Sequence, residues 1–337
     1  MQLFRSSTVL TTLTVCMALT GSVYGQGKPE DKKQEQLKLS KDEMTQLKTL
    51  TGLVDAVIAG KEPAPADVKI TFRNHFIKSA TNIFVPYQLE IGSGKFSSFP
   101  VALYVRAVRR GTVTTAEDPP FSDIYFLSAN QLVNAQDTAL LARALELPPG
   151  EFDVYIAMSE TLPRNAKTPP KRVVHTQSVT VPDLSMGLTT SSIILAKNLE
   201  DAPQQLTARQ QMEQPFTIGG QKITPDFTST FSKSGELLFL FMVYNEGATP
   251  AGKPDLDVGY TLSRGEEAKP FAKMPNTTFN ATTLPAEFNL SAGHQVLVAQ
   301  GLPLATFAAG NYKLTIAITD KTNGQNITRT VPFSVSE

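Results

Sequence analysis

Three histidines are the residues of this chain best suited to acid–base or metal chemistry. His75, His175 and His294 are far apart in the sequence, and each lies in a strand or turn context. A zinc site needs three or four converging ligands, and neither HExxH nor CxxC spacing occurs in the sequence. The pattern therefore indicates histidines that serve the fold or the surface. It predicts no metal and no cofactor.

A second candidate is the stretch "GSGKFSS" from Gly92 to Ser98, which is similar to a phosphate-binding loop. The first glycine of that motif would fall at Leu89, no Ser or Thr directly follows Lys95, and no helix is expected after it. We expect a glycine-rich hairpin loop instead. The Gly-x-Ser-x-Gly spacing of a nucleophile elbow is also missing from the sequence.

Carboxylates are the remaining groups that could do chemistry. Glu266 and Glu267 fall in an expected turn, where solvation accounts for them, and a sequence cannot show the facing pair that a glycosidase needs. Asp255, Asp257 and Asp320 lack the dense alternating oxygen ligands of a calcium loop, so we expect them to keep turns and edges soluble. The sequence thus predicts no catalytic residue and a protein that is not an enzyme.

Charge and an export signal narrow the class of protein. The 31 basic residues balance the 31 acidic ones, and no basic stripe interleaves with aromatics, which argues against nucleic-acid binding. Residues 1–25 resemble a signal peptide, with Arg5, an apolar stretch from Val9 to Leu19 and a small-residue cleavage site before Gln26. That stretch is shorter than the roughly 20 residues of a membrane span, so we expect no transmembrane segment after cleavage. A retained N-terminal anchor is the alternative.

Cysteine usage fits the same picture. The single cysteine, Cys16, lies inside the expected signal, so its removal leaves a chain without disulfides. Domains above about 100 residues can bury enough surface to fold without such bonds. The length favours two domains of that size.

An amphipathic helix is expected at residues 41–60, after a polar, disordered lead-in at residues 26–40. Ser40 and Glu43 form a capping box, and Gly60 closes the segment. Its apolar stripe must be buried against something, and it consists of Met44, Leu47, Leu50, Val54, Val57 and Ile58. Docking on the next domain is one interpretation. The other is a surface for self-association or for a partner.

From Asp67 onward, β-branched and aromatic runs with a period of two predict strands. We expect one β-sandwich at residues 66–184 and a second at 217–337. A linker with one strand candidate, "SSIILA", joins them at residues 185–216. For residues 130–147, a helical turn and a strand at 141–145 remain equally consistent.

The two expected sandwiches repeat each other. "PPGEFDVYIA" at 148–157 has an echo in "AAGNYKLTIA" at 308–317, and neighbouring segments match in the same order. Gly150 and Gly310 are expected at turns with positive φ, and a two-residue turn is expected at Asn323-Gly324. The predicted fold is mainly β, with two tandem immunoglobulin- or fibronectin-III-like antiparallel sandwiches after a signal peptide and one helix.

A short region resembles the immunoglobulin-like β-sandwich accessory region of secreted bacterial, especially acidobacterial, VWFA-related and GWxTD-domain proteins. The resemblance covers about 50 residues and is carried by Gly150 to Val154, "VPDL" at 181–184 and "TSSIILA" at 190–196. The chain has neither the Asp-x-Ser-x-Ser metal motif nor the Gly-Trp-x-Thr-Asp sequence. The resemblance implies an exported bacterial accessory domain and no metal-dependent adhesion site.

These features predict an exported, non-enzymatic scaffold for protein–protein or cell-envelope interactions, located in the periplasm or outside a bacterial cell. The partner would be a protein or an envelope component, with self-association through the helix as a further option. A carbohydrate-binding module is the alternative, although the absence of Trp weighs against an aromatic sugar platform. A hydrolase with an unrecognised site ranks last.

Overall fold

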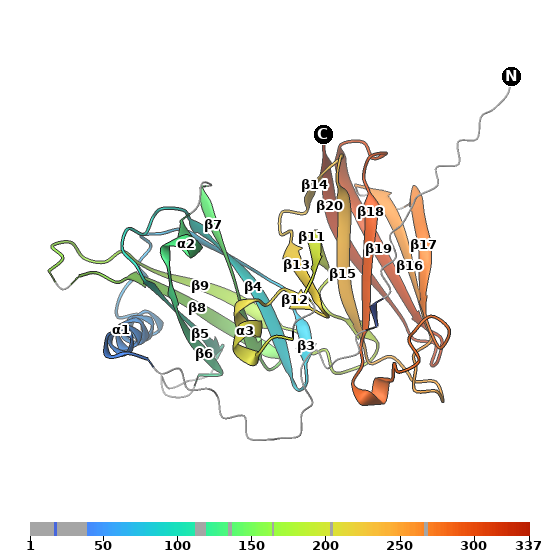
Figure 1. Ribbon diagram of the computed structural model, residues 1–337, viewed down its shortest axis with the longest axis horizontal. Coiled ribbons are helices and arrows are strands. Elements are labelled where there is room, and N and C mark those ends of the chain that lie inside the picture. Colours follow the sequence, from blue (N-terminus) through green and yellow to red (C-terminus); the bar gives the residue numbers. More distant parts are fainter. Residues whose placement is uncertain are drawn as a thin grey trace. The chain divides into compact units, whose positions relative to one another are not determined.

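The computed structural model describes residues 39–111, 119–133, 137–163, 165–202, 205–265 and 269–337, with the backbone of β1 (Met17–Ala18) (Figure 1). The rest of the expected signal and lead-in, and the pair Glu266–Glu267, lie outside these residues. The chain is mainly β and divides into two compact units. The N-terminal unit comprises residues 27–183 and 208–215, and the C-terminal unit comprises 1–26, 184–207 and 216–337. Among the described helices, none is long and apolar enough to cross a membrane.

The N-terminal unit contains two four-stranded antiparallel sheets. One sheet is built on a central strand and its three partners, namely β4 (Asn82–Gly92) with β2 (Ile70–Asn74), β3 (Ile77–Ser79) and β7 (Thr138–Leu147). The other has the order β6 (Phe121–Leu127), β5 (Val101–Arg109), β8 (Gly150–Glu160), β9 (Arg172–Val181). A short helix, α2 (Ala129–Leu132), precedes β7, so the region left open by the sequence holds both a helical turn and a strand.

The C-terminal unit also has two sheets. The first has the order β1, β18 (Val296–Pro303), β15 (Glu236–Tyr244), β11 (Ile194–Asp201), β13 (Gln221–Pro225), β12 (Thr217–Ile218), and β10 (Thr189–Thr190) pairs with β15. The second has the order β14 (Thr230–Ser232), β20 (Asn326–Ser336), β19 (Gly310–Asp320), β16 (Leu256–Arg264), β17 (Ala272–Phe279). A 3-10 turn at Leu290–Ala292 precedes β18. Both sheets contribute to one core, in which Phe239 and Phe241 pack with Tyr260 and Leu314, so this unit is a β-sandwich.

The internal repeat is visible in the strand pairing. The pairing of β6, β5, β8 and β9 recurs in β17, β16, β19 and β20, and the β4–β7 pair recurs as β15–β18. Gly150 and Gly310 have φ values of 141° and 148°, which confirms the expected turns. Arg109 lies opposite Phe152 with its guanidinium 5.0 Å from the ring centroid, and Arg264 lies opposite Tyr312 at 5.9 Å. The same arginine–aromatic pair therefore opens the same strand in both units.

Two expectations about connections are wrong. The strand candidate "SSIILA" is confirmed, since it leads into β11, but residues 185–216 do not lie between the domains as a linker, because β10 and β11 belong to a sheet of the C-terminal unit and α3 (Ala208–Glu213) belongs to the N-terminal unit. The Asn323-Gly324 turn is not a two-residue turn, since β19 ends at Asp320 and β20 begins at Asn326. The Asp320 carboxylate organises this longer loop by accepting hydrogen bonds from the Thr322 amide and hydroxyl.

The helix α1 (Lys41–Ile58) begins where expected and ends two residues before the predicted boundary at residue 60. The Ser40 hydroxyl accepts from the Glu43 amide, and the Glu43 carboxylate accepts from the Ser40 amide, which confirms the capping box. Leu50 and Val54 pack on the outer face of the β6–β5–β8–β9 sheet, against residues that include Ala102. Figure 1 shows α1 beside these strands. The strand β5 is buried along both faces for this reason, and its run "VALYVRAV" does not alternate.

Candidate functional site

The apolar stripe of α1 is divided between buried and exposed positions. Leu50 and Val54 are 0% exposed, and Leu47 and Val57 pack partly buried beside them. Met44 and Ile58 remain 42% and 39% exposed. The docking interpretation therefore describes the middle of the stripe, which is not available to a partner. The predicted interaction surface is reduced to the two residues at its ends.

An ion pair between a buried arginine and a carboxylate whose side chain is 40% exposed joins α1 to the sheet beneath it. Arg106 projects from β5 and is 2% exposed, and its Nη1 donates to Oδ1 of Asp55 at 2.5 Å. Tyr104 lies on the same face of β5, and burial raises the pKa of its hydroxyl. Sequence reasoning missed this pair. The available signal was a single arginine inside the apolar run of β5.

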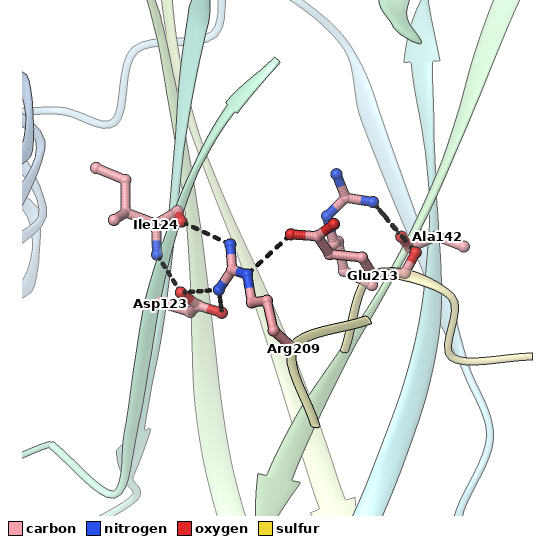
Figure 2. A network of polar contacts seen from close by, with 6 residues as sticks. Asp123, Ile124, Ala142, Arg209 and Glu213 are labelled. Atoms are coloured by element: carbon pink, nitrogen blue, oxygen red, sulfur yellow. Dashed lines mark hydrogen bonds and ion pairs between the residues drawn. The ribbon is translucent and has the colours of Figure 1, made fainter. Parts of the chain in front are cut away.

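A second network closes the outer edge of β6 (Figure 2). Arg209 of α3 donates through Nη1 to both carboxylate oxygens of Asp123, at 2.9 and 2.8 Å. Its Nη2 donates to the Ile124 carbonyl at 3.3 Å, and its Nε donates to Glu213 at 2.8 Å. The Ile124 amide donates to Asp123 at 2.7 Å. Both outward backbone groups of Ile124 are thus bound, which blocks strand pairing there.

The ring of Tyr125 anchors this network. The guanidinium groups of Arg209 and Arg143 lie 4.3 and 4.6 Å from its centroid. Arg143 is 6% exposed and donates to the Ala142 carbonyl at 2.7 Å and to the last carbonyl of α3, that of Glu213, at 3.5 Å. Burial, reinforced by the Asp123 carboxylate, raises the pKa of Tyr125. The phenol therefore stays neutral, and the arrangement is a clamp that holds α3.

The charge on Arg209 is stabilised by the same contacts. Burial pulls the pKa of Arg209 down, but the Asp123 carboxylate outweighs it and the net pKa is raised. Tyr87 of β4 is fully buried and lies opposite Arg143 of β7. Burial raises the pKa of Tyr87 as well. None of these shifts brings a group toward a pKa near 7, where general acid–base catalysis works best.

The glycine-rich loop after β4 binds an anion supplied by the chain itself. The backbone amides of Ser97 and Ser98 donate to the Glu160 carboxylate at 2.5 and 3.3 Å, and the Lys171 amide donates at 2.9 Å. Burial raises the pKa of Glu160, but these amides outweigh it, so the net pKa is lowered. The expectation of a hairpin loop is wrong, because β4 and β5 belong to different sheets and the loop connects the two, and its backbone donors serve the fold.

Buried charges of the C-terminal unit bind the chain's own backbone. Lys253, 8% exposed, donates to the carbonyls of Leu284 and Pro285 at 3.2 and 2.7 Å. Asp320 is 0% exposed and accepts from the Gly247 amide at 2.7 Å. The expectation that Asp320 is a solubilising turn residue is therefore wrong. It is a buried cap.

The three histidines occupy separate structural positions. His75 and His175 belong to the N-terminal unit, and His294 belongs to the C-terminal unit, where its Nδ1 accepts from the Asn289 amide at 2.9 Å. His175 lines a shallow groove of ≈ 320 Å³ between the start of β2 and β9. Burial lowers the pKa of His175, so its ring is neutral at pH 7. No group of three or more metal-ligating side chains gathers within the described ranges.

Acid should destabilise the N-terminal unit through its histidines. Burial lowers the pKa of His75 from 6.5 to about 4. Between pH 6.5 and pH 4 the imidazole is therefore protonated in the unfolded chain and neutral in the folded chain. The free energy of unfolding is therefore highest above pH 6.5 and falls as the pH falls toward 4. The pKa of His175 is lowered as well, so it acts in the same direction. We expect the free energy of unfolding, measured with urea, to be about 2 kcal/mol lower at pH 4.5 than at pH 7. His75→Gln should flatten that dependence, and an unchanged slope in the variant would contradict the assignment.

Comparisons with known proteins give no family. No family model matches the chain, and no curated protein matches it. Among solved structures, an α-2-macroglobulin from Salmonella is 11% identical, with a TM-score of 0.24, over 81% of this chain and 15% of that one. A purple acid phosphatase from yellow lupin (Lupinus luteus) seeds is 12% identical, with a TM-score of 0.21, over 79% of this chain and 41% of that one. The chain thus spans less than half the length of either structure.

Proposed function

We propose that this chain is an exported, non-enzymatic interaction protein of a bacterial envelope, built from two immunoglobulin- or fibronectin-III-like domains. The resemblance of residues 150–196 to secreted bacterial accessory domains and the signal-like residues 1–25 support the exported location. The partner is a protein or an envelope component.

The observation that carries the proposal is the use of the buried charges. The charged residues that the structure buries bind helices, turns or backbone of their own unit, and they are Arg106, Arg143, Glu160, Asp226, Lys253 and Asp320. Active sites instead keep perturbed ionisable groups available to a substrate. The buried charges of this chain therefore stabilise its fold. This use supports a protein that acts by binding partners at its surface.

A cross-linking capture from the native envelope tests the proposal. The tagged chain should recover one or a few envelope components in stoichiometric amounts, and a heat-unfolded sample of the same chain should not. An inert monomer that recovers nothing above this control would contradict the interaction role. Hydrolase activity that disappears on mutation of one Asp or Glu would replace it with the enzyme hypothesis.

The domain type is supported by a tyrosine at the start of β19. The Tyr312 hydroxyl donates to the Ala308 carbonyl at 2.7 Å, four residues upstream, as the tyrosine corner of immunoglobulin-like domains does. Tyr312→Phe should lower the stability of the C-terminal unit by about 1 kcal/mol in chemical denaturation. Arg264→Ala is the comparison variant, because it removes the longer 3.4 Å contact to the same hydroxyl and the cation–π contact but keeps the hydroxyl's bond to Ala308. Equal stability of Tyr312→Phe and the parent would contradict this role.

Carbohydrate binding stays the second candidate because of one exposed aromatic residue. Phe271 is 53% exposed and lies 5.8 Å from the ring centroids of both Phe307 and Tyr312. A supported, accessible ring of this kind can stack on a sugar. Binding on a glycan array that Phe271→Ala abolishes would favour this function.

A further inference from the structure

The outer edge of β9 is open over its second half. Within the described residues, β9 pairs along its length with β8, and the backbone contacts on its other side stop at Val174. There the Val174 amide donates to Pro65 at 2.8 Å, and the Arg172 carbonyl accepts from Asp67 at 3.1 Å. Beyond this point the strand runs seven residues further, from His175 to Val181, with one edge uncovered.

The register shows which groups face outward. Because backbone groups alternate sides in an antiparallel ladder, and those of Arg172 and Val174 point away from β8, those of Thr176, Ser178 and Thr180 point away as well. All three residues are exposed. Of these outward backbone groups, the Ser178 carbonyl accepts a hydrogen bond from the Gln177 side chain at 3.0 Å. An incoming strand could displace it without disturbing the β8 pairing.

Two other outer strands, β6 and β17, carry features that block edge pairing, and β9 does not. The β6 edge is bound by Asp123 and Arg209 at Ile124. The strand β17 carries Lys273 and Pro275, two residues that natural sheets use to block edge pairing. Residues 173–181, "VVHTQSVTV", contain no Lys, Arg, Asp, Glu or Pro.

The sister unit shows that this edge accepts a strand. In the C-terminal unit β14 pairs in parallel with Ser334–Ser336 of β20. Phe152 lies opposite Val179, and its counterpart Tyr312 lies opposite Phe333, so Val179 corresponds to Phe333. The paired residues Ser334–Ser336 therefore correspond to positions 180–182 of the N-terminal unit. The counterpart segment β3 pairs with β4 of the other sheet instead, which leaves the position on β9 vacant among the described residues.

We propose that β9 binds β9 of a second copy of this chain, antiparallel, so that the two four-stranded sheets form one continuous sheet across a two-fold axis. This deepens the interaction role proposed above and rests on it. A second copy fits because the uncharged edge places no like charges opposite each other, and because self-pairing about Ser178 sets Thr176 against Thr180, a favourable cross-strand pair.

Sedimentation velocity of the purified chain across a hundredfold concentration range tests the proposal. The parent should show a reversible monomer–dimer equilibrium. Thr176→Pro should weaken dimerisation at least tenfold, because it removes an outward N–H that β8 does not use. Thr176→Ala keeps that N–H and removes only the side-chain contacts of the Thr176–Thr180 pair, so it should weaken dimerisation much less than Thr176→Pro does. Thermal unfolding of both variants checks that the fold is retained.

A cysteine variant gives a second readout. Ser178→Cys, with Cys16→Ser in the same chain, should oxidise to a disulfide-linked dimer, since the two copies of residue 178 meet at the axis. A parent that is monomeric at every concentration, or a dimer that Thr176→Pro leaves intact, would overturn the proposal. If the monomer still captures an envelope component and Thr176→Pro abolishes that capture, the edge serves a different protein. That result would refute self-pairing while leaving the interaction role standing.

Discussion

Asp55→Ala should lower the free energy of unfolding of the N-terminal unit by about 2 to 3 kcal/mol, among the largest effects that we expect for a single substitution, with the loss moderated because the Asp55 side chain is 40% exposed and water can partly replace it. The substitution leaves the guanidinium of Arg106, 2% exposed, without its carboxylate partner beneath α1. A buried charge without a partner costs more than the pair itself contributes. Urea denaturation followed by far-UV circular dichroism measures the difference.

A second variant separates the charge from the packing. Asp55→Leu combined with Arg106→Met removes both charges and keeps apolar volume, so it should recover most of the lost stability. Thr49→Ala, which lies on the same helix and removes only a side-chain bond to the Thr45 carbonyl, should change stability by less than about 0.5 kcal/mol. A double variant as unstable as Asp55→Ala would contradict the charge argument.

Arg209→Ala should destabilise the same unit by about 2 to 3 kcal/mol and release α3. The substitution leaves Asp123, whose side chain is 15% exposed, beside Tyr125 without its bidentate partner, and it frees the Ile124 carbonyl at the β6 edge. Chemical denaturation gives the stability, and proteolysis within residues 205–215 reports the release of α3.

Glu213→Ala is the matched control for the second network. It removes the other carboxylate that binds Arg209, but that pair is a surface pair within one helix and is worth about 0.5 kcal/mol. If Glu213→Ala costs as much as Arg209→Ala, the stabilisation comes from α3 itself and not from its clamp on Asp123.

Local patterns predicted the elements of this fold well. Ser40 and Glu43 located the start of α1, and the glycines before Phe152 and Tyr312 located the turns into β8 and β19. These features depend on backbone geometry and on neighbours within a few residues, so one sequence contains them. The repeat also predicted that matching segments follow one another in both units, while the strand order within each sheet is given by the structure.

Long-range contacts were beyond the reach of sequence patterns. Arg106 and Asp55 are 51 residues apart, and Arg209 and Asp123 are 86 apart, so no local period relates them. The segment around Arg209 is polar and rich in glutamine, which is typical of a connector, yet α3 docks because its arginine meets a carboxylate and an aromatic ring. The buried role of Asp320 was hidden in the same way, since its partner Gly247 is remote in sequence.

Amide hydrogen exchange, resolved by residue and measured in dilute and concentrated samples, tests the central claim most directly. The claim is that charged side chains close the edge at β6 while the edge of β9 is left for a partner. The Ile124 amide should exchange slowly at every concentration. The amides of Thr176, Ser178 and Thr180 should exchange quickly in the dilute sample and become protected in the concentrated one. Rapid exchange at Ile124, or rapid exchange of the three β9 amides in both samples, would contradict the account.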